Sequence, residues 1–243
     1  MVAAMVSRMA LVIACAVVAS APASAAFHLM KVVEVFPGAA ASPNAQYVVL
    51  QMYANNQNVV GGHDLTVFDA AGTAIGTVTF GNNVATGVSQ AKILIATTQA
   101  ATFFNVAADF TLTTALPLRG GKVCFDVNEI DCVAWGNYAG TSVGVGTPYA
   151  QATGLVLGRA AIRRLDILAP NNTLQDGDDT NQSNNDFVDG IPAPRNNAGL
   201  FGTIPAAFCG NAVVEGLEQC DGGRGCSATC NLDADVLFTN GFE

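Results

Sequence analysis

Four cysteines within 22 residues near the C-terminus carry the most specific chemistry of this sequence: Cys209, Cys220, Cys226 and Cys230. Disulfide formation and zinc binding compete as uses for such thiols. The gaps between them are ten, five and three residues, so the Cys-x-x-Cys pair usual in structural zinc sites is missing, and no histidine lies nearby. The stretch also holds too few large aliphatic side chains to fold on hydrophobic burial alone. We therefore expect two disulfides, in one of three connectivities that the sequence does not distinguish.

A second cysteine pair, Cys124 and Cys132, flanks a short acidic turn between two segments that have the pattern of strands. A bridge between neighbouring strands would fix the register of this hairpin. Closing so small a loop is worth about 2–3 kcal/mol in the chain-entropy model. The alternative is two buried free thiols.

An acidic loop, Asn171–Asp189, contains the residue types that bind calcium. Asp176, Asp178 and Thr180 stand at positions 1, 3 and 5 of a candidate calcium loop, and Asp186 offers a further carboxylate. Phe187 stands where an EF-hand has its bidentate glutamate, so the loop is not an EF-hand. A polar loop that turns through Asx-turns explains the same composition without a metal. Calcium is the one cofactor that the sequence suggests.

Signs of hydrolytic catalysis are weak. The two histidines are His28 and His63, and His63 follows two glycines at an expected turn. No Gly-x-Ser-x-Gly or His-Glu-x-x-His motif occurs. The sequence therefore predicts that the protein is not an enzyme.

Three arginines, Arg159, Arg163 and Arg164, precede the acidic loop. We expect them to pair with Asp166 and with the aspartates at 176–179, each exposed pair contributing less than about 1 kcal/mol. The alternative is that these arginines bind an anionic surface polymer.

The N-terminus has the features of a cleavable signal peptide over residues 1–25. Arg8 precedes an apolar run over residues 9–19, and Ala23-Ser24-Ala25 offers a cleavage site. The rival interpretation is a lipobox that ends at Cys15. Cleavage would remove Cys15 from the seven cysteines and leave six, an even number that suits three disulfides in an oxidising compartment. We expect a secreted or cell-surface protein without a transmembrane segment, since no apolar run reaches about 20 residues.

The composition limits the partners and the fold class. The chain has 10 basic and 19 acidic residues and a net charge of −9, which disfavours direct binding to nucleic acid. Eight short segments with strand-like patterns, separated by turn residues, predict an all-β sandwich; they are residues 31–36, 46–53, 65–68, 77–80, 92–96, 110–112, 121–125 and 132–135. A short helix or turn is expected at residues 99–107.

The order of several short motifs over residues 29–199 resembles the lamin-tail domain in its bacterial secreted form. The matching segments are Val32–Val35, Tyr47–Tyr53 with Asn55, Asp131–Gly136, Arg163 or Arg164, the loop from Asp176, Asp186-Phe187 and Pro192–Asn196. The resemblance implies an immunoglobulin-like β-sandwich. The acidic residues of the family's second strand and the tryptophan after it are missing here.

The cysteine block at residues 209–231 resembles the short cysteine-rich repeat of secreted myxobacterial proteins. It begins Cys209-Gly210-Asn211, continues through Val213-Val214-Glu215 and Cys220-Asp221, and ends with Cys226-Ser227 and Cys230. A linker over residues 200–208 precedes it. An apolar tail over residues 232–243 follows and is similar to Gly-Phe-Glu endings on exported proteins of some Gram-negative bacteria. Such a tail would dock on a sheet edge or be read by sorting machinery.

These observations predict an immunoglobulin-like β-sandwich followed by a small disulfide-rich module. The expected function is that of a non-catalytic interaction or adhesion module, with an envelope protein or polysaccharide as partner. The alternatives are an accessory component of a secreted hydrolase system and a structural surface-layer protein.

Overall fold

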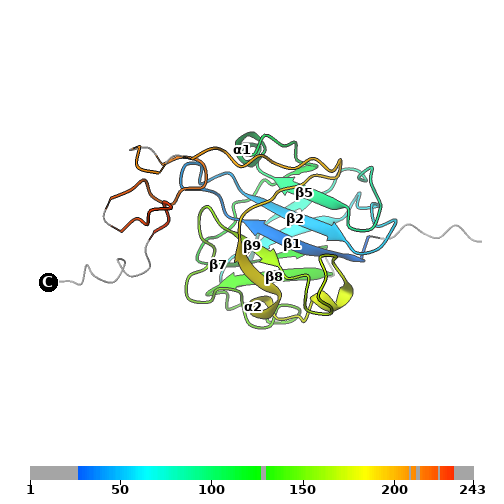
Figure 1. Cartoon of the computed structure of the whole chain (residues 1–243). Helices are drawn as coiled ribbons and strands as arrows, with labels where there is room; N and C mark the ends of the chain where they lie inside the picture. The colour runs from blue at the N-terminus through cyan, green and yellow to red at the C-terminus, as the bar shows by residue number, and fades with distance from the viewer. Residues whose placement is uncertain (1–26, 127–129, 208, 212–213, 224, 233–243) are drawn as a thin grey trace, which may run out of the picture.

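Ten strands form two β-sheets in the part of the chain that the computed structural model describes, residues 27–126, 130–207, 209–211, 214–223 and 225–232. The expected signal peptide and the last eleven residues of the expected tail lie outside these ranges. The larger sheet has the order β10-β9-β1-β2-β5-β6 and the smaller sheet the order β4-β3-β7-β8 (Figure 1). Neighbouring strands are antiparallel except for β5 and β6.

The elements follow one another as β1 (Met30–Phe36), β2 (Tyr47–Met52), β3 (Asp64–Phe68), β4 (Ala74–Thr79), β5 (Lys92–Ala96), α1 (Thr98–Phe103), β6 (Phe110–Thr111), β7 (Gly120–Phe125), β8 (Asp131–Gly136), β9 (Ala160–Arg163), the 3-10 turn η1 (Asp176–Asp178), α2 (Ser183–Asp186) and β10 (Phe187–Gly190).

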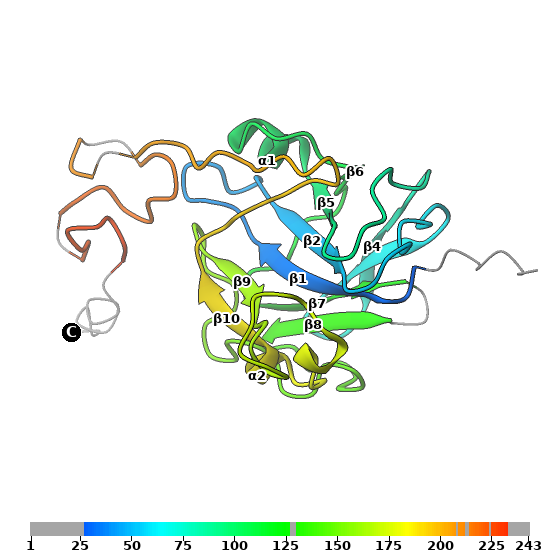
Figure 2. The ribbon, with the colours of Figure 1, turned by 45° about the vertical axis from the view of Figure 1, so that its right-hand side comes forward.

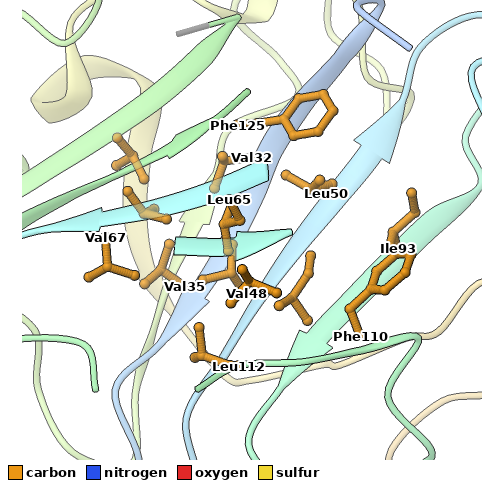
Figure 3. Close-up of a cluster of buried hydrophobic side chains, with 14 of the residues drawn as sticks. Val32, Val35, Val48, Leu50, Leu65, Val67, Ile93, Phe110, Leu112 and Phe125 are labelled. Atoms are coloured by element: carbon orange, nitrogen blue, oxygen red, sulfur yellow. The ribbon is translucent and has the colours of Figure 1, made fainter. Parts of the chain in front are cut away.

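The main hydrophobic core fills the space between the two sheets (Figure 3). Val48, Leu50 and Ile93 come from the larger sheet, and Leu65 and Phe125 come from the smaller sheet; all five are fully buried. Strand β3 shows the expected period of two, because Leu65 and Val67 are buried while the residues between and beside them are half-exposed. The burial of these side chains, each worth about 1.5–3 kcal/mol, is what holds the sheets together.

The outer face of the larger sheet is also covered, so β1 and β2 are buried along their whole lengths. A second apolar cluster there includes Phe36, Tyr47 and Phe104, whose rings contact one another at centroid distances of 5.1–5.5 Å. Helix α1 begins beside this cluster, with the Thr97 hydroxyl accepting the Ala100 N–H at 3.0 Å.

Residues 191–203, which we call the covering segment, run from β10 across this outer face to α1 (Figure 2). Asn197 anchors the segment: its backbone N–H donates to Asp109 at 2.8 Å, and its side chain donates to the carbonyls of Thr86 and Lys92 at 3.0 and 3.1 Å. At the far end, the Thr203 N–H donates to the Phe104 carbonyl at 2.7 Å. These bonds attach the covering segment to β5 and to the α1 region.

The predicted all-β class with a disulfide-rich module is confirmed, and a strand is present in each of the eight expected segments. Strands β9 and β10 were not expected, because both have only four residues and no long alternation. The expected short helix is α1. Within the described ranges, no helix is long and apolar enough to cross a membrane.

Candidate functional site

A buried ionic cluster joins the two sheets at the place where the sequence suggested a calcium loop. Arg163, at the end of β9, has a fully buried side chain. Its Nη2 donates to both carboxylate oxygens of Asp131 in β8, at 2.9 and 2.8 Å, and its Nε donates to the Val32 carbonyl at 2.7 Å. Lys31 in β1 donates to Asp179 at 2.8 Å. We call Lys31, Arg163, Asp131 and Asp179 the paired cluster.

The pKa values of the two aspartates move in opposite directions. Burial raises the pKa of Asp131 to about 7, although Arg163 opposes this shift. Burial also acts to raise the pKa of Asp179, but Arg163 and Lys31 outweigh it and hold that pKa well below its usual range. Desolvation acts on both carboxylates, but the negative charge of Asp179 also raises the pKa of Asp131, whereas the hydrogen bond from Lys31 lowers the pKa of Asp179. Burial lowers the pKa of Lys31, but Asp131 and Asp179 outweigh it, so that pKa is raised.

Two of the four predicted calcium ligands are satisfied by donors of the protein itself. The carboxylate of Asp178 accepts the backbone N–H groups of Ile167, Leu168 and Gln175 at 2.9–3.2 Å. The carboxylate of Asp186 accepts the hydroxyl of Thr180 at 2.5 Å and its N–H at 3.0 Å. These are the bonds of a polar loop that is stabilised by Asx-type turns.

Side-chain cations lie among the remaining loop oxygens. The Nζ of Lys31 lies 3.6 Å from the Oδ1 of Asp176, an aspartate whose side chain is mostly exposed. The Nη1 of Arg163 lies 3.4 Å from Asp179 and 3.9 Å from Asp186. These contacts favour the metal-free interpretation, in which two protein cations take the place of the metal. Calcium binding stays a prediction that chelation tests.

The arginines behave differently from one another. Arg164 pairs with Asp166 at 3.1 Å, as the sequence predicts, and both side chains are exposed. Arg159 pairs instead with Asp189 in β10. Arg163 is buried, so its pairs are not the exposed pairs that the sequence analysis expected.

The described cysteines form three disulfides. Cys124–Cys132 joins β7 to β8, as expected for this hairpin. In the module, Cys209 bonds to Cys230 and Cys220 to Cys226, which selects one of the three connectivities. A group of Glu218, Asp221 and Cys230 lies within metal-binding distance, but the sulfur of Cys230 is in a disulfide and offers no thiolate.

His63 has a structural role in the described contacts. Its Nδ1 lies 2.7 Å from the Oδ1 of Asp126, and its ring stacks on that of Phe27. Its place after two glycines predicted a turn, and nothing near it in the sequence indicated either partner.

An exposed apolar surface begins at the edge strand of the larger sheet. Strand β10 pairs with β9 on one side only and ends the sheet, as Figure 2 shows. Val188, Ile191 and Ile204 are exposed large apolar residues on this side, and we call these three residues the apolar strip. Leu200 and Phe201 are exposed too, but they follow Asn197, which is bound to β5 toward the other side of the sheet.

A cleft of about 350 Å³ lies where the sandwich meets the disulfide module. Ile191 and Ile204 of the apolar strip line it, together with Leu217 of the module. The module is attached beside this cleft by the Gln219 side chain, which donates to the Leu157 carbonyl at 3.1 Å. The apolar strip therefore continues into a concave surface that both parts of the protein build.

Comparison with known proteins gave no match to a family model, to a curated protein or to a solved structure.

The sequence did not indicate that Lys31 and Asp131 complete the paired cluster, whereas Asp179 was expected to pair with the arginines and lies 3.4 Å from Arg163. Lys31 lies on β1 and Asp131 on β8, far from the acidic loop in sequence, so they form no local motif with it. A signal that could have indicated them is the presence of charged residues in two strands that are otherwise mostly apolar.

Proposed function

We propose that the protein is a non-catalytic binding module that works outside the cytosol, in the envelope or on the cell surface. The apolar strip carries this proposal. Isolated exposed apolar residues are ordinary, but Val188, Ile191 and Ile204 lie at a sheet edge and a cleft, an arrangement that is typical of an interaction surface.

Disulfide chemistry supports the expected location. Three disulfides persist only in an oxidising compartment, and two of them stabilise a module that buries little apolar surface. A protein held together in this way suits a place where reductants are absent.

The free side of β10 indicates how a partner would bind. Its unpaired backbone groups would accept an extended segment of an envelope protein as an added strand, while the exposed side chains of Val188 and Ile191 would supply apolar contacts. Asp189, which follows Val188 in β10, accepts a hydrogen bond from the Nε of Arg159 at 2.8 Å.

Capture from detergent-solubilised envelope fractions of the host tests this function. The purified mature protein carries an N-terminal tag, and the double variant Val188→Lys/Ile191→Lys is run beside it. Val143→Lys is the matched control, since Val143 is 74% exposed and lies outside the apolar strip. The proposal predicts that one or a few identified proteins are captured by the wild type and by Val143→Lys and are lost with the double variant. Equal capture by all three proteins, or none by any, would contradict it.

A further inference from the structure

A second pocket, of about 280 Å³, lies between the start of β5 and the covering segment. Ser89, Gln90 and Lys92 line one side, and Arg195, Asn196 and Asn197 line the other. The pocket thus combines two cations with polar side chains on the outer face of the larger sheet. We call it the open pocket.

Neither cation of the open pocket has a direct carboxylate partner among the described residues. Among the residues that the structure describes, no carboxylate oxygen lies within 4.0 Å of a side-chain nitrogen of Lys92 or Arg195. Arg195 instead donates to the Gly199 carbonyl at 3.3 Å and lies over the Phe201 ring at 4.6 Å. By contrast, Lys31, Arg159, Arg163 and Arg164 each have a carboxylate partner.

Glu34 is the acidic residue whose charge acts on Lys92, and its carboxylate already accepts two hydrogen bonds from other groups. Glu34 is buried, and its Oε1 accepts the Tyr47 hydroxyl at 2.5 Å and the Ala193 N–H at 2.7 Å. Burial lowers the pKa of Lys92, Glu34 opposes this shift, and the neighbouring charge of Arg195 adds to it. The charged form of Lys92 is therefore disfavoured by burial and by Arg195, and an anion bound in the open pocket would stabilise that charged form.

The walls of the open pocket are fixed before any ligand arrives. Gln90 has a left-handed backbone, with φ 73°, which is uncommon for a residue other than glycine. Its side-chain oxygen accepts from the Gln51 amide at 2.7 Å and from the Leu174 N–H at 2.8 Å. Asn196 donates to the Ala107 carbonyl at 3.0 Å and holds the opposite wall. A preformed site loses little conformational entropy when it binds.

We propose that the open pocket binds the carboxylate or phosphate group of a monosaccharide-sized molecule, with Lys92 and Arg195 as the anion-binding residues. Its volume is near the lower end of small-molecule pockets, which begin at about 300 Å³. The net charge of −9 disfavours a long polyanion, so a single charged group on a small molecule or chain end is the better ligand. This site goes beyond the apolar strip, and neither depends on the other.

Calorimetric titration of the purified mature protein tests the open pocket with four probes: glucuronate, glucose 6-phosphate, inorganic phosphate and glucose. We expect binding of at least one of the three anions and none of glucose. Glucuronate alone would identify a carboxylate ligand, and the two phosphate probes would identify a phosphate ligand. No binding of any anion at 10 mM, or equal binding of glucose, would overturn the proposal.

Matched variants locate the binding. Lys92→Gln and Arg195→Gln should each weaken binding of the anion by about tenfold or more, because each removes a charge-assisted hydrogen bond. Arg119→Gln removes the same charge at an exposed arginine outside the open pocket and should change affinity by less than about twofold. Lys92→Arg keeps the charge and should retain binding. Equal losses in Arg119→Gln and in the pocket variants would show a general charge effect and contradict the site.

Discussion

Two groups of cations on the larger sheet differ in how their charge is balanced. In the paired cluster, Lys31 and Arg163 meet carboxylates at 2.8 Å, and Arg163 is fully buried. In the open pocket, Lys92 and Arg195 have no described carboxylate within 4.0 Å. The first group joins β1, β8, β9 and the acidic loop, whereas the second lines a cavity. The paired charges thus connect elements of the fold, whereas the charges without a direct carboxylate partner line the pocket that we propose as a ligand site.

Replacement of Arg163 by Met should have the largest effect on stability. It leaves Asp131 buried with only Lys31, whose Nζ is 3.9 Å away, and breaking a buried pair typically lowers the free energy of unfolding by about 3–5 kcal/mol. Arg164→Met is the control one residue along the chain, where an exposed pair with Asp166 is worth less than about 1 kcal/mol. Urea denaturation of both variants measures the two values. Similar small losses would remove the distinction between buried and exposed pairs.

Replacement of Lys92 by Met should have little effect on stability, or a stabilising one. The ammonium group is partly buried, unpaired by a carboxylate and close to Arg195, so its removal breaks no ion pair. We expect a change of no more than about 1 kcal/mol in the destabilising direction. Urea denaturation beside Arg163→Met checks this contrast. A loss as large as that of Arg163→Met would mean that the open pocket is also a structural cluster.

The stability of the paired cluster should fall on both sides of mildly acidic pH. Because the pKa of Asp179 is lowered, its stabilising contribution is present above its unfolded value and is lost as the pH falls below about 4. Because the pKa of Asp131 is raised to about 7, its contribution is lost as the pH rises from its unfolded value through 7. Melting temperatures between pH 2 and 8 should therefore be highest near pH 4 and fall from there toward pH 2 and toward pH 7.

The variant Asp179→Asn separates the two limbs of this profile. It has no carboxylate to protonate at this position, so the acid limb should become shallower while the limb near neutral pH remains. An unchanged acid limb would show that Asp179 does not control it.

Chelation should have the smallest effect. Since Asp178 and Asp186 bind protein donors, and Lys31 and Arg163 lie among the other loop oxygens, neither EDTA nor 5 mM CaCl₂ should move the melting temperature by more than about 1 °C. Differential scanning calorimetry checks this. A drop in EDTA that CaCl₂ reverses would restore the calcium interpretation of Asp176, Asp178, Thr180 and Asp186.

Local patterns predicted much of the fold. The alternation in Leu65–Phe68 and the turns between segments placed strands, because a sheet that covers a core leaves a period of two in the sequence. The cysteines that flank a short acidic turn likewise indicated their own pairing. Strands β9 and β10 were not predicted because four residues are too few to show an alternating pattern. They are also defined by pairing with strands that are far away or separated by a long loop in the sequence.

The sites were less predictable for the same reason. The acidic loop was identified by composition, but its cations come from β1 and β9, and Lys31 lies 148 residues from Asp179. In the open pocket, Lys92 of β5 lies near Arg195 of the covering segment only because that segment folds over the sheet. The sequence around neither residue indicates the pocket.

The pKa of Lys92, followed by NMR of ¹³C-labelled lysine during titration with the anion that binds, tests the contrast between the two groups most directly. The account predicts that the pKa of Lys92 rises as the anion fills the open pocket, while the pKa of Lys31, already paired with Asp179, does not change. An unchanged pKa for Lys92, or an equal rise for both lysines, would contradict it.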